Sequence, residues 1–154
     1  GFHLPENFDH PYLKSNLAKF WDSWHITLSQ WIRTYFFNPF NRYLRKTKFS
    51  NSPLSILFIT QLATMVIIGL WHGITWTFFI WGLWHGVGLF LQNRWSHFVK
   101  IHFPKIQKNL SLQKAIQIIS TMITFTYVSL GWVWFLSATP QQAGNIFLVL
   151  FGKG

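Results

Sequence analysis

The sequence predicts an all-α, multi-helix integral membrane protein, and three observations support this prediction. Half of the 154 residues are hydrophobic, a fifth are aromatic and a tenth are charged, whereas about a quarter are charged in soluble globular domains. The segment 54–91 contains no Asp, Glu, Lys or Arg, and neither does the segment 116–136. Uncharged runs of this length are typical of helices buried in a lipid bilayer.

The charge balance is strongly basic, with 13 Lys and Arg against 3 acidic residues and a formal net charge of +10. Such a charge suits nucleic acid or an anionic membrane surface. The basic segments lack interleaved aromatic residues, so we expect contacts with membrane lipid and no nucleic-acid partner. The absence of cysteine excludes disulfides, thiolate nucleophiles and Cys-ligated metals.

The chain is expected to be a piece of a longer protein. It begins with Gly1 instead of Met and shows no charged segment followed by an apolar core, so no signal peptide is visible. We therefore treat residues 1–154 as a single fragment of one membrane domain.

The first third of the chain is predicted to hold one amphipathic helix. Residues 1–16 contain two prolines and read as an extended lead-in. Residues 17–37 contain neither proline nor glycine, and a helical period places most large apolar side chains on one arc and most polar ones opposite. This pattern predicts a helix that lies in the membrane interface or packs inside a bundle. Pro39 is expected to end the helix, and a basic loop should follow up to residue 53.

The uncharged segment 54–91 is predicted to be a broken helical hairpin. A single helix of this length would run about 57 Å, far more than a hydrocarbon core of about 30 Å. Gly69 and Gly73 place the break between a helix near 54–70 and another near 76–91. Basic segments flank the hairpin on both sides, which predicts that both of its ends face the cytoplasm.

Two further apolar segments follow a second basic connection at 94–114. Residues 116–136 predict a third span that ends in an aromatic belt. Residues 143–151 predict a partial helix that is too short to cross a bilayer.

Histidine is the side chain here best suited to proton transfer near neutral pH. Four of the seven histidines lie in polar or basic segments and are interpreted as solvated surface residues: His3, His10, His97 and His102. The other three are His25, on the border of the amphipathic pattern, and His72 and His85, which interrupt the uncharged hairpin.

The position of His72 at the predicted break makes it a candidate general base. An ionisable group in a membrane segment usually faces a cavity, a pathway or a partner, and we expect a neutral imidazole that can accept a proton. The alternative is a structural histidine bonded to a backbone carbonyl that the break sets free. For His85 the structural interpretation, a histidine in helix packing, is favoured, and for His25 both interpretations stay open.

Other chemistries fit the sequence less well. Imidazoles of His25, His72 and His85 could in principle bind a transition metal, but no pair has the spacing of a helical ligand pair and no carboxylate lies near, so we predict no metal site. Neither Ser29 nor Ser129 lies in the sequence context of an activated nucleophile.

Several strings of the sequence, taken together and in order, resemble one family. They are Gly1-Phe2, Pro5-Glu6-Asn7-Phe8, Pro11-Tyr12, Phe20-Trp21, Trp24-His25-Ile26-Thr27-Leu28-Ser29 with Trp31, Arg33 and Tyr35, Gly69-Leu70-Trp71-His72-Gly73 with Trp76, Trp81-Gly82-Leu83, His85-Gly86 and Gly131-Trp132-Val133 with Phe135. This series resembles the membrane-bound O-acyltransferases, in particular the bacterial branch with alginate O-acetyltransferase and the D-alanyl transfer protein of teichoic acids. Because family members are much longer, this chain resembles a C-terminal portion.

The resemblance implies an integral enzyme of the cell membrane. It would transfer an acyl group, acetyl or D-alanyl, from a cytoplasmic thioester such as acyl-CoA or acyl carrier protein, with no other cofactor. The acceptor would be a hydroxyl of a cell-envelope polysaccharide or teichoic acid, reached with or without a partner acyltransferase outside the membrane.

The family pattern maps its catalytic histidine onto His72 and its second active-site histidine onto His25. We take five further residues of the strings as candidates for lining a substrate channel: Trp24, Ser29, Trp71, Trp76 and His85. The competing hypothesis is a non-catalytic membrane component, or a scaffold, whose histidines line a conduit or hold helices together.

Overall fold

The computed structural model describes residues 4–47, 51–104 and 109–152, and these are built from helices. The described part contains no β-strand, only an isolated antiparallel bridge between Phe8 and Trp24. In chain order the elements are a 3-10 helix η1 (Pro11–Leu13), α1 (Leu17–Ser23), α2 (Ile26–Ile32), a π-helix η2 (Arg33–Phe37), α3 (Asn38–Leu44), α4 (Pro53–His72), α5 (Trp76–His102), α6 (Leu110–Leu136) and α7 (Pro140–Leu150). The predicted all-α class is confirmed.

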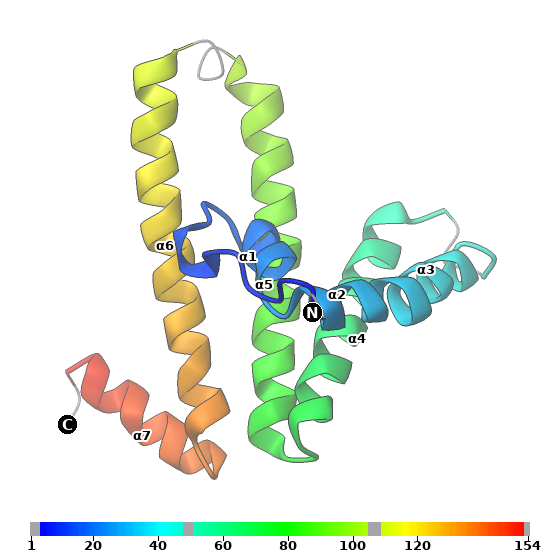
Figure 1. Ribbon diagram of the computed structural model, residues 1–154, viewed down its shortest axis with the longest axis vertical. Helices are drawn as coiled ribbons and strands as arrows, with labels where there is room; N and C mark the ends of the chain where they lie inside the picture. The colour runs from blue at the N-terminus through cyan, green and yellow to red at the C-terminus, as the bar shows by residue number, and fades with distance from the viewer. Residues whose placement is uncertain (1–3, 48–50, 105–108, 153–154) are drawn as a thin grey trace.

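The long helices form the frame on which the shorter ones lie (Figure 1). Helices α5 and α6 run side by side, α4 packs against α5, and α1 and α2 cross the middle of this frame. Helix α7 turns away from the end of α6. The buried core forms where α1 and α2 meet the hairpin and includes Phe20, Ile32, Met65, Trp81 and Val128.

Helices α4 and α5 pack closely because glycines lie at their contact. A Cβ atom added to Gly82 would lie 2.6 Å from the backbone oxygen of Met65, and one added to Gly86 would lie 2.9 Å from the Cα atom of Leu62. Gly82 and Gly86 are four residues apart and so share one face of α5. Small residues at this spacing let membrane helices approach until their backbones touch.

Helices α5 and α6 are joined by a reciprocal pair of hydrogen bonds. The indole N–H of Trp84 donates to the backbone oxygen of Tyr127 at 3.2 Å, and the Tyr127 hydroxyl donates to the backbone oxygen of Trp84. The two rings stack with centroids 4.8 Å apart. Such bonds replace the contacts with water that an apolar environment cannot supply.

Among the described helices, two are long and apolar enough to cross a membrane, namely α4 with a mean hydropathy of 2.0 and α6 with 1.4. Only 28% and 17% of their apolar windows are buried inside the protein, so most of their side chains are free to face lipid. Helix α5 has the same length as α6, but tryptophans, glycines and a basic end lower its hydropathy.

The prediction of one helix over 17–37 is wrong, because the chain breaks at Trp24 and His25. Trp24 is extended and His25 takes a left-handed conformation with φ 44°. The lead-in occupies the backbone groups at the break, since the N–H of Ile26 donates to the oxygen of Asn7 at 3.0 Å. These tertiary hydrogen bonds replace those of a continuous helix.

The expected end of the helix at Pro39 is also wrong. Pro39 lies in the first turn of α3, directly after the π-helix η2, and the chain stays helical to Leu44. The predicted basic loop is correspondingly shorter, and its residues 48–50 lie outside the described part.

The remaining boundaries differ by smaller amounts. Helix α4 passes through Gly69 to His72, two residues beyond the predicted end near residue 70, and α5 begins at Trp76, so the hairpin breaks within the predicted interval. The basic segment 94–114 is mostly helical, because α5 continues to His102 and α6 begins at Leu110. The predicted partial helix at 143–151 is α7, which begins at Pro140.

Candidate functional site

His72 is the last residue of α4 and is half-buried in a ring of aromatic side chains. Its ring centroid lies 4.9 Å from that of Phe135, 5.7 Å from Trp81 and 6.0 Å from Phe78. Phe78 and Trp81 come from α5 and Phe135 from α6. The end of one helix therefore delivers the imidazole to a place where three helices meet.

His25 lies at the break between α1 and α2 and is the N-cap residue of α2. Its ring contacts Phe8 of the lead-in and Trp24, with centroids 4.9 and 5.8 Å away. Its backbone oxygen accepts the N–H of Ser29 at 2.9 Å and so begins the hydrogen bonding of α2. Because a left-handed backbone is unfavourable for a residue with a side chain, the surroundings must hold His25 in place.

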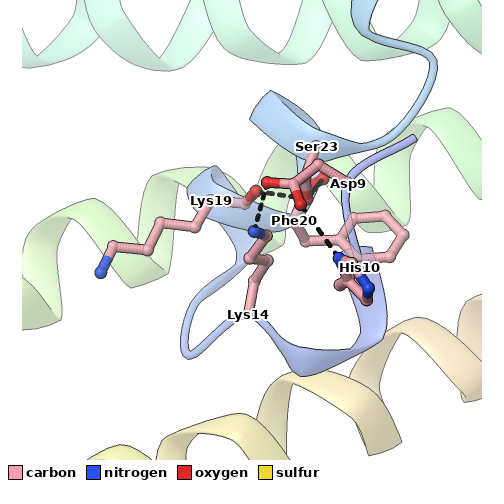
Figure 2. Close-up of polar contacts among 6 residues, drawn as sticks. All are labelled: Asp9, His10, Lys14, Lys19, Phe20 and Ser23. Atoms are coloured by element: carbon pink, nitrogen blue, oxygen red, sulfur yellow. Dashed lines mark hydrogen bonds and ion pairs between the residues drawn. The ribbon is translucent and has the colours of Figure 1, made fainter. Parts of the chain in front are cut away.

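The lead-in supplies that support through a polar cluster (Figure 2). The N–H of Asp9 donates to the backbone oxygen of Ser23 at 3.0 Å, and its carboxylate accepts from Lys14 at 2.8 Å and lies 3.1 Å from Nδ1 of His10. Lys14 and His10 hold the pKa of the Asp9 carboxyl below its ordinary value. The chain before the break is thereby fixed to the end of α1.

A second contact fixes the chain after the break. The side-chain oxygen of Asn7 accepts the N–H of Thr27 at 3.0 Å and its hydroxyl at 2.9 Å. Residues on both sides of His25 are therefore bonded to the same extended segment.

The structure places His25 and His72 at two edges of one aromatic cluster. Aromatic contacts connect the segments that carry them. The ring centroid of Trp24 lies 5.3 Å from that of Trp132, and the centroid of Trp132 lies 5.1 Å from that of Phe135, whose ring contacts His72. Residues from the lead-in, the break and three helices thus surround one half-open pair of histidines.

His85 lies inside the helix packing, with 1% of its surface exposed. The centroid of its ring lies 4.9 Å from that of Trp81 and 5.2 Å from that of Trp21. Neither ring nitrogen has a hydrogen-bond partner among the described residues. A Cβ added to Gly131 of α6 would lie 2.8 Å from its Nε2 atom. Its surroundings fit the structural interpretation, and Trp81 separates it from His72.

The other channel candidates are distributed over different surroundings. Trp24 is half-buried beside His25, whereas Trp71 and Trp76 flank the α4–α5 turn with 62% and 72% of their surfaces exposed. Ser29 lines a cavity of about 260 Å³ between the amphipathic helices and the hairpin.

The described residues include no group of three or more His, Asp or Glu side chains placed to hold a metal ion. His25, His72 and His85 therefore do not assemble as a ligand set. The chemistry that the His25–His72 pair can perform is proton transfer and hydrogen bonding to a substrate.

Sequence reasoning did not single out the aromatic walls of the site. Phe78, Trp81 and Phe135 surround His72; Trp81 and Phe135 belong to the family strings, but nothing in the sequence places these three rings around His72. Gln61 was also missed, although a signal existed, because it is an amide inside an uncharged apolar run.

The fold and the site define an integral membrane protein with a histidine pair set among transmembrane helices. The family model of the membrane-bound O-acyltransferases matches residues 3–134, and the chain belongs to this family.

Three relatives that are similar to this chain have names that describe the transfer of an acetyl or D-alanyl group. The chain is 34% identical over 153 residues to a peptidoglycan O-acetyltransferase of Helicobacter pylori, covering 97% of this chain and 25% of the relative. It is 33% identical over 154 residues to a probable alginate O-acetylase of Azotobacter vinelandii (100% and 27%). It is 32% identical over 135 residues to a teichoic acid D-alanyltransferase of Bacillus subtilis (88% and 33%). The chain thus spans about a quarter to a third of the length of these relatives.

Proposed function

We propose that the full-length protein containing this chain is an O-acyltransferase of cell-envelope polymers, with His72 as the general base. The acyl group is of the acetyl or D-alanyl type, and the acceptor is a hydroxyl of an envelope polysaccharide or teichoic acid. One observation carries the proposal: two histidines from separate segments border one aromatic cluster, through Trp24 and Trp132 on one side and Phe135 on the other, within a chain of the O-acyltransferase family. The names of the relatives support the choice of acyl groups and acceptors.

In the proposed reaction the acyl group passes directly from the sulfur of the thioester donor to the hydroxyl oxygen of the acceptor. The acceptor oxygen attacks the carbonyl carbon of the thioester, forming a C–O bond, while His72 takes the hydroxyl proton. The C–S bond then breaks, and the thiolate takes up the proton to leave as a thiol. His25 donates a hydrogen bond that orients the substrate or stabilises the charge developing on the carbonyl oxygen.

The position of the site fits an acceptor that arrives from the outer side of a cell membrane. The basic ends of α5 and α6 face the cytoplasm under the positive-inside rule. His72 ends α4 near the start of α5, at the opposite end of α5 from the basic residues, and so lies toward the outer side. The donor is a cytoplasmic thioester, acyl-CoA or an acyl carrier protein. The acceptor polymer is reached outside, directly or through a partner acyltransferase.

Mass analysis of envelope polysaccharide and teichoic acid, from cells with and without the full-length gene, tests this proposal. We expect one ester-linked acyl group to disappear with the gene and to return with the wild-type copy but not with a His72→Ala copy. Unchanged acylation in the deletion strain would contradict the proposal and favour a non-catalytic membrane component.

A further inference from the structure

A groove of about 840 Å³ lies between the halves of α5 and α6 that lead to their basic ends, and α1 crosses it from the side (Figure 1). Residues of α6 between 113 and 127 form one wall. The lining residues of α5 recur at helical spacing and form the facing stripe: Gly88, Leu91, Gln92, Trp95, Val99 and Lys100.

The groove has a narrow end and a basic end. At the narrow end Gly88 packs against Tyr127, because a Cβ atom on Gly88 would overlap the Tyr127 hydroxyl. Since the two helices run antiparallel, Lys100 and Gln113 lie together at the other end, where Lys100 is exposed. A helix rises about 18 Å from Gly88 to Lys100, close to half of a hydrocarbon core of about 30 Å. The groove therefore has about the length of one lipid leaflet.

The groove carries positive charge that the protein leaves uncompensated. Lys100 lies at its basic end, Lys19 of α1 lines it from the side, and no Asp or Glu is among its lining residues. Neither lysine has an ion-pair partner among the described residues, since Asp9 and Asp22 pair with other side chains. A lysine side chain can lay its methylenes along apolar surface and direct its ammonium toward a headgroup.

The walls also hold large apolar side chains that are exposed. Leu91, Trp95 and Ile123 expose 59%, 66% and 64% of their surfaces. Among the polar lining residues, Gln92 donates to the Ser96 hydroxyl at 2.8 Å, which lowers the cost of placing both beside an acyl chain. The lining thus combines a surface for hydrocarbon with unpaired positive charge.

An anionic phospholipid fits this combination better than a further helix of the full-length protein does. A helix would meet long side chains here, not glycines like those that let α4 and α5 approach closely. It would also have to bring acidic residues to the two lysines. Basic pockets between helices on the cytoplasmic side of a membrane are typical sites for anionic headgroups.

We propose that the α5–α6 groove binds an anionic phospholipid of the cytoplasmic leaflet. Its acyl chain lies against the walls formed by Leu91, Trp95 and Ile123, and its negative headgroup compensates Lys100 and Lys19. This site is separate from the proposed acyl transfer, because neither His25 nor His72 lines the groove.

The test titrates the full-length protein in detergent micelles with dioleoylphosphatidylglycerol, which is anionic, or with dioleoylphosphatidylcholine, which has no net charge. Native mass spectrometry counts the lipids bound. The charge variant is Lys19→Gln with Lys100→Gln. Its matched control is Lys46→Gln with Lys114→Gln, which removes the same charge from two exposed lysines outside the groove.

A second pair of variants tests the groove without changing its charge. Ser120→Trp fills the groove, because Ser120 is half-buried in its lining. The matched control is Ile119→Trp, since Ile119 is 56% exposed on the same helix and lies outside the lining.

We expect the wild-type protein to bind its first phosphatidylglycerol with a Kd at least tenfold lower than that for phosphatidylcholine. A lysine near an anionic headgroup is worth about fivefold in affinity, so the charge variant should lose this preference and its control should keep it. Ser120→Trp should weaken phosphatidylglycerol binding, and Ile119→Trp should not. Thermal midpoints in phosphatidylcholine separate these effects from unfolding.

Three results would overturn the proposal. A wild-type protein without the preference would show that other parts of the full-length chain fill the groove. Equal losses in the charge variant and its control would indicate a general effect of surface charge. Displacement of the bound lipid by soluble coenzyme A would assign the groove to a soluble phosphate-bearing ligand. Because the titration contains no acyl donor or acceptor, all three are distinct from failure of the proposed function.

Discussion

His25, at the α1–α2 break, and His72, at the end of α4, are linked by a chain of aromatic contacts. Neither position is set by its own helix alone. The lead-in holds the break that carries His25, and aromatic residues of α5 and α6 hold the ring of His72. Because several segments hold these two histidines, their arrangement depends on the folded chain. Each of the following predictions is therefore paired with a control.

Replacement of His72 by alanine should abolish acyl transfer without unfolding the protein. General-base catalysis contributes about 10² to 10⁴ in rate, and a half-buried side chain at a helix end leaves little packing to lose. Transfer is measured in membranes of the full-length protein, with His102→Ala as control, because His102 is exposed at the far end of α5. Equal activity of the two variants would remove His72 from the role of base.

Variants of His25 should separate its backbone role from its side-chain role. Asparagine tolerates a left-handed backbone, so His25→Asn should keep the thermal midpoint and lose transfer. Valine does not tolerate it, and His25→Val should lose about 1–3 kcal/mol of stability as well. Full activity in His25→Asn would show that the ring is dispensable.

The α4–α5 contact should not accept even a methyl group at Gly82. The added Cβ would lie 2.6 Å from the oxygen of Met65 and 2.7 Å from the Cα atom of Val66, and backbone atoms cannot move aside cheaply. We expect Gly82→Ala to lower stability by about 1–3 kcal/mol.

The matched control for this contact is Gly144→Ala in α7, where an added Cβ meets nothing within 4 Å. It should be neutral or stabilising by up to about 1 kcal/mol, because alanine is the better helix former. Thermal midpoints of the purified full-length protein compare the two, and similar midpoints would contradict the close packing.

The polar cluster around Asp9 should weaken in acid. The pKa of Asp9 is lowered in the folded protein, mainly by the Lys14 hydrogen bond. The contribution of the Asp9 carboxylate to the stability of the fold is therefore complete above the ordinary pKa of 3.8, and it is lost as the pH falls through the lower pKa of the folded state. Carboxyl NMR titration should show the Asp9 pKa rising toward 3.8 in Lys14→Met.

The control for the acid titration is Lys19→Met, since the Lys19 side chain points away from Asp9 (Figure 2). We expect the Asp9 pKa to be the same in this variant as in the wild type. Equal titration of Asp9 in Lys14→Met and in the wild type would refute the proposed contact.

Much of the helical frame follows from local sequence. The uncharged runs at 54–91 and 116–136 predicted the hairpin and the later span, and Gly73 ends α4 because its extended backbone, with φ 164° and ψ 145°, cannot continue a helix. The break at His25 was not predictable in this way. Residues 17–37 have helical periodicity throughout, and only hydrogen bonds from the distant Asn7 and Asp9 interrupt it.

The sequence by itself determined the class of protein and the long apolar helices, and it picked out the two histidines as candidates, because hydrophobic periodicity, missing charges and family strings are properties of neighbouring residues. Tertiary structure alone decided that His25 and His72 border one aromatic cluster, that His85 is enclosed between Trp21 and Trp81, and that Gln61 faces a cavity. These relationships join segments far apart in the chain, and they depend on how closely the glycine-lined helices pack and where the lead-in binds.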